Sequence, residues 1–147
     1  MTLQGTRTWL ERAVLDAPDR VLFWVVDHAG RHIGHIGLNR FAPDASFCEL
    51  DNIVRGEPSE AKGIMTAAVE KLLQWQRESL RVPTSYLRVF SDNAHAIAFY
   101  NKLGYREIGR VPLRKVPVEG GWSWEEVVAD PYRMIPRYFV TMQQGEP

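Results

Sequence analysis

The chain has 147 residues, which allows one domain with a buried core over residues 1–147 and leaves little room for a second. Its 18 basic and 18 acidic side chains give a formal charge of zero, so no general field favours nucleic acid or an anionic membrane. No apolar run approaches the roughly 20 residues that span a bilayer, and the N-terminal pattern is not that of a secretory signal. The single cysteine cannot form an internal disulfide. For these three reasons we expect a cytoplasmic protein.

The first part of the sequence predicts one helix followed by a strand hairpin. Residues 6–16 place apolar side chains at helical spacing, and Pro18 closes that segment. The stretch 21–27 is rich in β-branched and aromatic residues, and after a short turn an extended pattern resumes over 31–41. We therefore expect an antiparallel pair of strands there.

Two glycines lie inside the second of these strands. Gly34 and Gly37 indicate a β-bulge or the close approach of another backbone, since glycine in a strand interior has no side chain to pack. After a second turn, a third strand is expected over 47–54.

Helices and strands alternate in the remainder. An apolar stripe from Ile64 to Leu73 predicts an amphipathic helix of about five turns. Further elements are expected in this order: a strand over 85–90, a short helix after Asn93, a strand over 105–113 and an edge strand over 138–143. The segment 117–137 is expected to be irregular.

This order of elements predicts an α/β fold. Strands first and strand–helix alternation afterwards indicate a mixed, mostly antiparallel sheet of about six strands flanked by helices. The crossover through the long helix should make the third and fourth strands a parallel pair.

The segment 91–105, SDNAHAIAFYNKLGY, has features that are individually ordinary. Asn93 lies where a helix cap belongs, which is worth roughly 1 kcal/mol. Tyr100 suits a half-buried aromatic with its hydroxyl at the surface, and Gly104 suits a helix stop with positive φ.

Their joint spacing is more specific, because the segment resembles the N-x-x-A-x-x-[FL]-Y-x-x-x-G-[FY] signature of the GNAT N-acetyltransferases, which use acetyl-coenzyme A (acetyl-CoA). The resemblance covers about residues 6–143 and implies the GNAT fold, with a splayed central parallel pair forming the cofactor cleft. It implies that Asn93 hydrogen-bonds the pantetheine arm or the backbone around it, that the small Ala96 lets the cofactor pass, and that Tyr100 aims its hydroxyl at the thioester sulfur. A phenol placed there can donate a proton to the departing thiolate, so Tyr100 is the predicted catalytic acid and Phe99 is expected to pack in the core.

The resemblance also implies a pyrophosphate-binding turn before the long helix, where backbone amides and the helix dipole hold the anion. The cofactor-binding residues that match this turn are Lys62, Gly63, Ile64 and Met65. The usual glycine-rich spacing is missing, and Glu57 and Glu60 place acidic groups near the expected anion site, where they suit a solvated turn. The preceding strand end is expected to hydrogen-bond the pantetheine like an added strand, through Ile53, Val54 and Arg55.

An amine must lose a proton to attack a thioester, and the third strand offers carboxylates for this. Alternation over 47–54 places Glu49 and Asp51 on one face, where mutual repulsion would raise one pKa. Glu49 is the first choice of base, Asp51 the second, and His35 a weaker candidate. The alternatives are that both carboxylates line a solvent-facing surface or bind a cationic substrate.

The remaining reactive side chains suggest no further chemistry. Cys48 falls on the face opposite the carboxylates and is expected to be a buried small apolar residue rather than a nucleophile. The four histidines show no metal-ligand spacing, so no metal is expected.

Two departures from the family pattern bear on partners. The family begins with a strand and a helix that have no counterpart here, so either the chain starts late or a partner subunit fills the gap. An exposed strand edge invites pairing with another chain, and we expect a homodimer. The tail carries Trp122, Trp124 and Tyr132, which suit either a packed extension of the sheet or a lid over the acceptor.

We therefore predict an acetyl-CoA-dependent N-acetyltransferase that acts by direct attack of a primary amine in a ternary complex. The first part of the sequence resembles the branch that contains ribosomal-protein N-terminal and amino-sugar acetyltransferases, and the aromatic tail favours an amino sugar. The alternative is a degenerate GNAT domain that serves as a non-catalytic interaction module.

Overall fold

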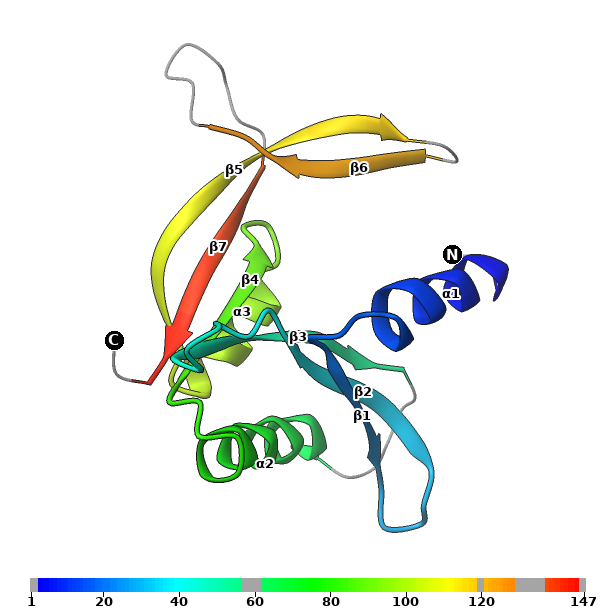
Figure 1. The fold of residues 1–147 in the computed structure, drawn as a ribbon, viewed down its shortest axis with the longest axis vertical. Helices are drawn as coiled ribbons and strands as arrows, with labels where there is room; N and C mark the ends of the chain where they lie inside the picture. The colour runs from blue at the N-terminus through cyan, green and yellow to red at the C-terminus, as the bar shows by residue number, and fades with distance from the viewer. Residues whose placement is uncertain (1–2, 57–61, 119–120, 129–136, 146–147) are drawn as a thin grey trace. The chain divides into compact units, whose positions relative to one another are not determined.

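A computed structural model describes residues 3–56, 62–118, 121–128 and 137–145 (Figure 1). Its strands belong to a seven-stranded sheet with the order β1-β2-β3-β4-β7-β5-β6, accompanied by helices, so the predicted α/β class is confirmed. Contacts group the chain into two compact units, residues 1–85 and residues 86–145. The parallel pairing of the third and fourth strands and the single domain stay predictions.

The first unit begins with a helix that changes its winding. It contains α1 (Leu3–Leu10), a π-helix η1 (Glu11–Leu15), β1 (Val21–Val26), β2 (His32–Asn39), β3 (Phe47–Arg55) and α2 (Ile64–Glu78). The helix predicted over 6–16 therefore starts earlier and is α-helical only in its first half. Over so short a segment, the spacing of apolar residues does not distinguish an α-helix from a π-helix.

The three strands form an antiparallel meander, which confirms the predicted hairpin and third strand. The register of β2 against β3 shifts between His35 and Gly37, and Asn52 opposite this shift has a φ of 53°. A Cβ on Gly34 would lie 1.9 Å from the carbonyl oxygen of Val54. Both predicted functions of the glycines, a bulge and a close backbone approach, are thus confirmed.

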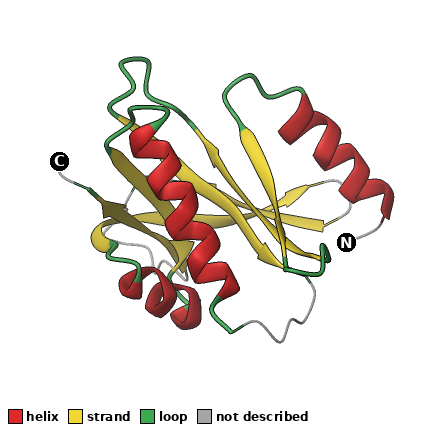
Figure 2. Cartoon of the chain, turned by 90° about the horizontal axis from the view of Figure 1, so that it is seen from below, coloured by secondary structure: helices red, strands yellow, loops and turns green. Residues whose placement is uncertain are grey.

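Helix α2 packs on one face of the meander and supplies much of the core of this unit (Figure 2). Its fifteen residues make about four turns, slightly fewer than expected. The ring of Trp75 meets Phe23 of β1 edge-on, with centroids 5.3 Å apart. The buried side chains of the helix are Met65, Val69, Leu72, Leu73 and Gln76.

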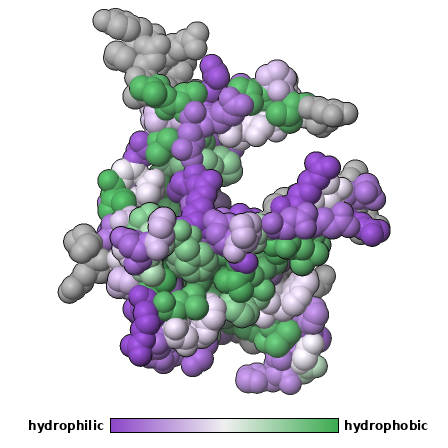
Figure 3. All heavy atoms as spheres, viewed as in Figure 1, coloured by the Kyte–Doolittle hydropathy of each residue, from purple (hydrophilic) through white to green (hydrophobic). Residues whose placement is uncertain are grey.

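Strand β1 ends the sheet within the described part of the chain. Its six residues carry no charge, and Phe23, Trp24 and Val26 are 39%, 61% and 50% exposed. Figure 3 shows apolar residues reaching the surface of this unit. An apolar edge of this kind favours pairing with a further strand.

The second unit contains most of β4 (Thr84–Phe90), α3 (Ala94–Lys102), β5 (Arg106–Val118), β6 (Gly121–Glu126) and β7 (Arg137–Gln144). The first part of β5 pairs antiparallel with β7 and the second part with β6, with Leu113 as the residue where the partners change. The core side chains of this unit include Leu87, Val89, Tyr105, Leu113, Val140 and Met142.

Two expectations for the tail are wrong. The first part of the segment 117–137 is not irregular, because β5 continues to Val118 and pairs with β6 as a hairpin. The last strand is not an edge strand, since β7 lies between β4 and β5 in the strand order. The rest of the tail, including Tyr132, lies outside the described residues.

Candidate active site

Helix α3 starts and stops where the sequence predicts. The side-chain oxygen of Asn93 accepts a hydrogen bond from the amide of Ala96 at 3.1 Å, so Asn93 is the N-cap. Gly104 has a φ of 90°, in the left-handed region that favours glycine at a helix stop. Because the cap uses Oδ1 of Asn93, its side-chain amide nitrogen is the group that can donate to a ligand.

Tyr100 is half-buried on α3 and lies among aromatic rings. Its ring centroid is 5.4 Å from that of Phe99 and 6.0 Å from that of Tyr105, which is fully buried. No residue of α3 is itself buried, so the prediction that Phe99 packs in the core is wrong. The aromatic contact with Tyr105 therefore fixes the ring of Tyr100 against the core of its unit.

The carboxylates of β3 share one face, as predicted. Cys48 and Leu50 are buried on the opposite face, and Glu49 and Asp51 are partly exposed. The predicted alternation through Val54 is wrong beyond Asp51, because the bulge at Asn52 inserts an extra residue into β3 and interrupts the period of two.

Asp51 is surrounded by hydrogen-bond donors. Its Oδ1 accepts from the backbone amide of Asn52 at 2.7 Å. Its Oδ2 lies 3.2 Å from Nη2 of Arg20 and from Nδ2 of Asn39, and accepts from Nδ2 of Asn52 at 3.0 Å. Asp51 thus joins the bulge residue Asn52 to Arg20 and Asn39.

Glu49 has a different setting. Its Oε2 lies 3.2 Å from Nη1 of Arg40, and its side chain is only 13% exposed. Each carboxylate therefore has its own arginine, which offsets the mutual repulsion expected from the sequence. Arg20 and Arg40 are not among the residues predicted from the sequence, although Arg20 directly precedes the predicted strand 21–27 and Arg40 lies within the predicted strand 31–41.

The N-terminus of α2 offers a site for an anion. Gly63 is its N-cap with a φ of 77°, and no side chain caps the helix within the described residues. The first helical amides and the positive end of the dipole therefore suit a phosphate group. Met65 is buried in the core, which leaves its backbone amide rather than its side chain for such a role.

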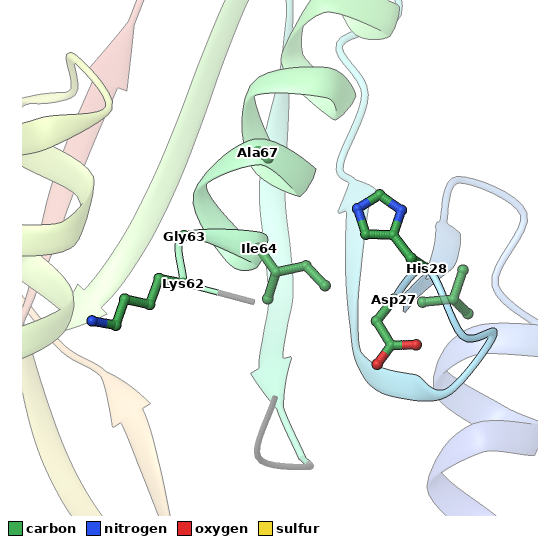
Figure 4. Close-up of a pocket in the computed structure, with 7 residues that line it drawn as sticks. Asp27, His28, Lys62, Gly63, Ile64 and Ala67 are labelled. Atoms are coloured by element: carbon green, nitrogen blue, oxygen red, sulfur yellow. The ribbon is translucent and has the colours of Figure 1, made fainter. Parts of the chain in front are cut away.

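A pocket of about 350 Å³ lies between this helix start and the turn after β1. Figure 4 shows Ile64 directed toward Asp27 and His28, while the ammonium group of Lys62 points away from them. The lining consists of Val26, Asp27, His28, Lys62, Gly63, Ile64 and Ala67.

The carboxylate of Asp27, which lines this pocket, is hydrogen-bonded within its own turn. Asp27 accepts hydrogen bonds from the backbone amides of Arg31 and Ala29 and from the Arg31 side chain. The backbone bond from Arg31 and the pairing with its guanidinium hold the pKa of Asp27 below its usual value. Neither Asp27 nor His28 was predicted to line a pocket, since loop side chains carry no periodic signal.

The predicted site residues thus occupy two sets. One set lies in the first unit, on β3 and at the start of α2; it comprises Glu49, Asp51, Ile53, Val54, Arg55, Lys62, Gly63, Ile64 and Met65. The other set, Asn93, Ala96 and Tyr100, lies on or directly before α3 in the second unit.

Other chemistry finds little support in the described structure. Burial raises the pKa of the Cys48 thiol to about 12, so this residue is the buried apolar side chain that was predicted. In residues 3–56 and the other described ranges, no group of three or more His, Cys, Asp or Glu side chains could hold a metal ion. None of the described helices has the length and apolar character needed to cross a membrane.

Structures of bacterial polyamine acetyltransferases have a similar fold. A spermidine N-acetyltransferase from Vibrio cholerae, solved with CoA and spermine, is 16% identical, with a TM-score of 0.70 over 99% of this chain and 76% of that one. The manganese complex of the spermidine/spermine N-acetyltransferase from Vibrio cholerae is 17% identical, with a TM-score of 0.68 over 98% and 75%. A dodecameric structure of the Vibrio cholerae spermidine N-acetyltransferase is 17% identical, with a TM-score of 0.68 over 98% of this chain and 74% of that one.

At the level of sequence, no curated protein matches the chain. A family model does match: that of the acetyltransferase (GNAT) domain aligns with residues 1–106, well over half of the chain. These residues include β3, the start of α2 and the whole of α3, where the predicted site residues lie. The chain therefore belongs to the GNAT family of N-acetyltransferases.

Proposed function

We propose that this protein transfers the acetyl group of acetyl-CoA directly to a primary amine in a ternary complex. The observation that carries the proposal is α3, a helix capped by Asn93 that holds Tyr100 against a buried aromatic, within a GNAT domain. The neighbouring structure solved with CoA and spermine supports a thioester donor and an amine acceptor.

The residues around α2 fit the anionic part of acetyl-CoA. Backbone amides after Gly63, at Ile64 and Met65, would hold the pyrophosphate at an uncapped helix start. Lys62 would add a charge contact after a change of rotamer, since its ammonium group points away from the pocket. The backbone of Ile53, Val54 and Arg55 would bind the pantetheine as an added strand.

The residues of α3 would serve the reacting end. The amide nitrogen of Asn93 would donate to the pantetheine, and Ala96 would leave space for it. When bound, acetyl-CoA supplies an activated acyl group on sulfur. Tyr100 would donate its phenolic proton to that sulfur as the carbon–sulfur bond breaks, and the amine nitrogen takes the acetyl group.

Glu49 is the preferred acceptor of the amine proton, directly or through water. Four donor groups already surround the oxygens of Asp51, and this supports a positioning function for Asp51. His35 is a weaker candidate, because Nδ1 of its ring lies 2.8 Å from the carbonyl oxygen of Asn52 and is already engaged.

The acceptor that we propose is an amino sugar. The indole of Trp122 on β6 is 64% exposed with the Lys115 ammonium 4.9 Å from its ring centre, and such a surface suits stacking against a sugar ring. Polyamines are the second candidate, because the neighbouring structures are those of spermidine acetyltransferases.

We also propose a homodimer that pairs the β1 edges of two copies. The support is the uncharged sequence of β1 and the exposure of Phe23, Trp24 and Val26. A dodecameric neighbour supports self-association in this fold, although with a different number of copies.

Turnover by single-site variants tests the proposed chemistry. Amino sugars, spermidine and a peptide with a free N-terminus are offered as acceptors, and CoA release is measured. With the preferred acceptor, Tyr100→Phe and Glu49→Gln are each expected to lower kcat by roughly 100-fold, because each removes one proton-transfer group. Glu107→Gln, which alters an exposed ion pair with Arg110, is the matched control and should retain full activity.

The outcomes separate the enzyme from the non-catalytic alternative. Turnover that depends on Tyr100 and Glu49 supports the transferase. A folded protein that releases no CoA with any of the acceptors would instead support a degenerate domain. If Glu49→Gln kept full activity and Asp51→Asn lost activity, the general base would be Asp51 rather than Glu49.

A further inference from the structure

Helix α3 has an unusual means of support. None of its nine residues is fully buried, so the packing of an apolar face supports it less than it supports a helix with a buried face. Beside the ring contact of Tyr100 with Tyr105, the contacts at the two ends of the helix therefore contribute to the positions of Asn93 and Tyr100.

The N-terminal end is attached to the first two residues of β7. Nε and Nη2 of Arg137 lie 3.0 and 2.8 Å from Oδ1 of Asp92, the residue before the Asn93 cap. The backbone amide of Ser91 donates to the carbonyl of Tyr138 at 2.9 Å, and the amide of Tyr138 donates to the Ser91 hydroxyl at 3.2 Å.

Arg137 is itself held by aromatic rings. Its guanidinium carbon lies 3.7 Å from the ring centre of Phe90 and 5.1 Å from that of Trp124, both within cation–π range. The Phe90 ring stacks on Phe139 with centroids 4.8 Å apart. Although Asp92 is 62% exposed, these rings restrict the arginine, so the contact is more defined than an ordinary surface ion pair.

The C-terminal end of α3 is attached to the last residue of the same strand. Nε2 of Gln144 donates to the carbonyl of Leu103, the C-cap, at 2.7 Å. A Cβ on Gly104 would lie 3.7 Å from that Nε2, so the amide also contacts the helix stop. The two ends of β7 therefore hold the two ends of α3.

We propose that Arg137 and Gln144 are positioning residues that set the placement of the Tyr100 hydroxyl through α3. This inference rests on the proposed function of Tyr100. Small displacements of a reacting group have large effects on rate, and the contacts at its two ends restrain a helix that has no fully buried residue.

The first test is hydrogen exchange of the α3 amides, which does not depend on activity. Arg137→Gln should speed exchange in the first turn of α3 by about tenfold or more, and Gln144→Ala should do so in the last turn. Arg114→Gln is the matched control, since Arg114 pairs with Glu125 on the hairpin and should leave α3 unchanged. Unchanged α3 exchange in both positioning variants would overturn the proposal.

The second test is a double-mutant cycle on kcat. Arg137→Gln should lower kcat roughly tenfold in the native background and less than twofold in Tyr100→Phe, because its effect passes through the Tyr100 hydroxyl. Arg137→Lys, which keeps the charge but not the paired donors, should recover part of the loss. Equal losses in both backgrounds would contradict the proposal. If Tyr100→Phe alone kept full activity, Tyr100 would not be the catalytic acid, and the proposed function of this residue would be wrong. The hydrogen-exchange test would still decide whether β7 holds α3.

Discussion

The thiol of Cys48 shows how burial removes reactivity from a nucleophilic side chain. Cys48 is fully buried in β3, between two partly exposed neighbours that include Glu49. Burial raises its pKa from 9.0 to about 12, because the thiolate would lose hydration without gaining a partner. The face that carries Glu49 and Asp51 is therefore chemically distinct from the face that carries the thiol.

Labelling of this single cysteine gives a clear prediction. At pH 8 a thiol reagent should modify the native protein at least 100-fold more slowly than the protein in denaturant, since reaction requires opening of the core. The raised pKa adds a pH dependence: its contribution to stability is fully present below about pH 9 and is lost as the pH rises toward 12. Fast, complete labelling of a protein that keeps its native circular dichroism would contradict this placement.

Residue identity alone predicted some of these environments. Asn93 and Gly104 were placed correctly because a cap and a left-handed helix stop depend on local chemistry. The ion-pair partners of Glu49 and Asp51 were not predicted from the sequence. Arg40 and Arg20 contact these carboxylates from other parts of the meander, and such contacts depend on the strand register.

At the scale of elements, the β2–β3 bulge brings two backbones unusually close. It places the carbonyl of Val54 where a side chain at position 34 would lie, and it interrupts the alternation of β3 just after Asp51. The bulge thus separates the carboxylate part of β3 from Ile53, Val54 and Arg55, which we propose for the cofactor. Such irregularities are common next to active sites.

Gly34→Ala should therefore destabilise the protein. Its Cβ would lie 1.9 Å from a backbone oxygen, so the strands must separate, at a cost of about 2 kcal/mol or a decrease of roughly 6 °C in Tm. Gly109→Ala on β5 is the control, because a Cβ there meets nothing within 4 Å and its stability should change by less than about 0.5 kcal/mol. Thermal unfolding measures both, and an equal Tm for the two variants would contradict the close approach.

Element type could be predicted better than element order. The strands and helices before residue 106 carry clear periodicity, and all of them were found close to their expected positions. The β5–β6 hairpin was missed because Pro117 lies within the last part of β5 and proline normally argues against a strand. The inner position of β7 was missed because sequence order does not give spatial order in a sheet.

At the scale of the molecule, the proposed functional residues come from both compact units. The first unit contributes an uncapped helix start and two arginine-paired carboxylates, and the second contributes a capped helix with Tyr100. The family assignment was accessible from one motif in the second unit, whereas the proposed phosphate site has only a partial sequence pattern, because backbone amides leave no side-chain signature.

Calorimetric titration of the native protein with acetyl-CoA, beside Tyr100→Phe and Gly63→Pro, tests the central claim most directly. We predict binding in the micromolar range that is retained in Tyr100→Phe, since the phenol acts mainly in the transition state. Binding should weaken at least tenfold in Gly63→Pro, because proline cannot adopt the φ of 77° at the start of α2. A folded native protein that shows no heat of binding, or equal affinity in Gly63→Pro, would contradict the proposed cofactor site.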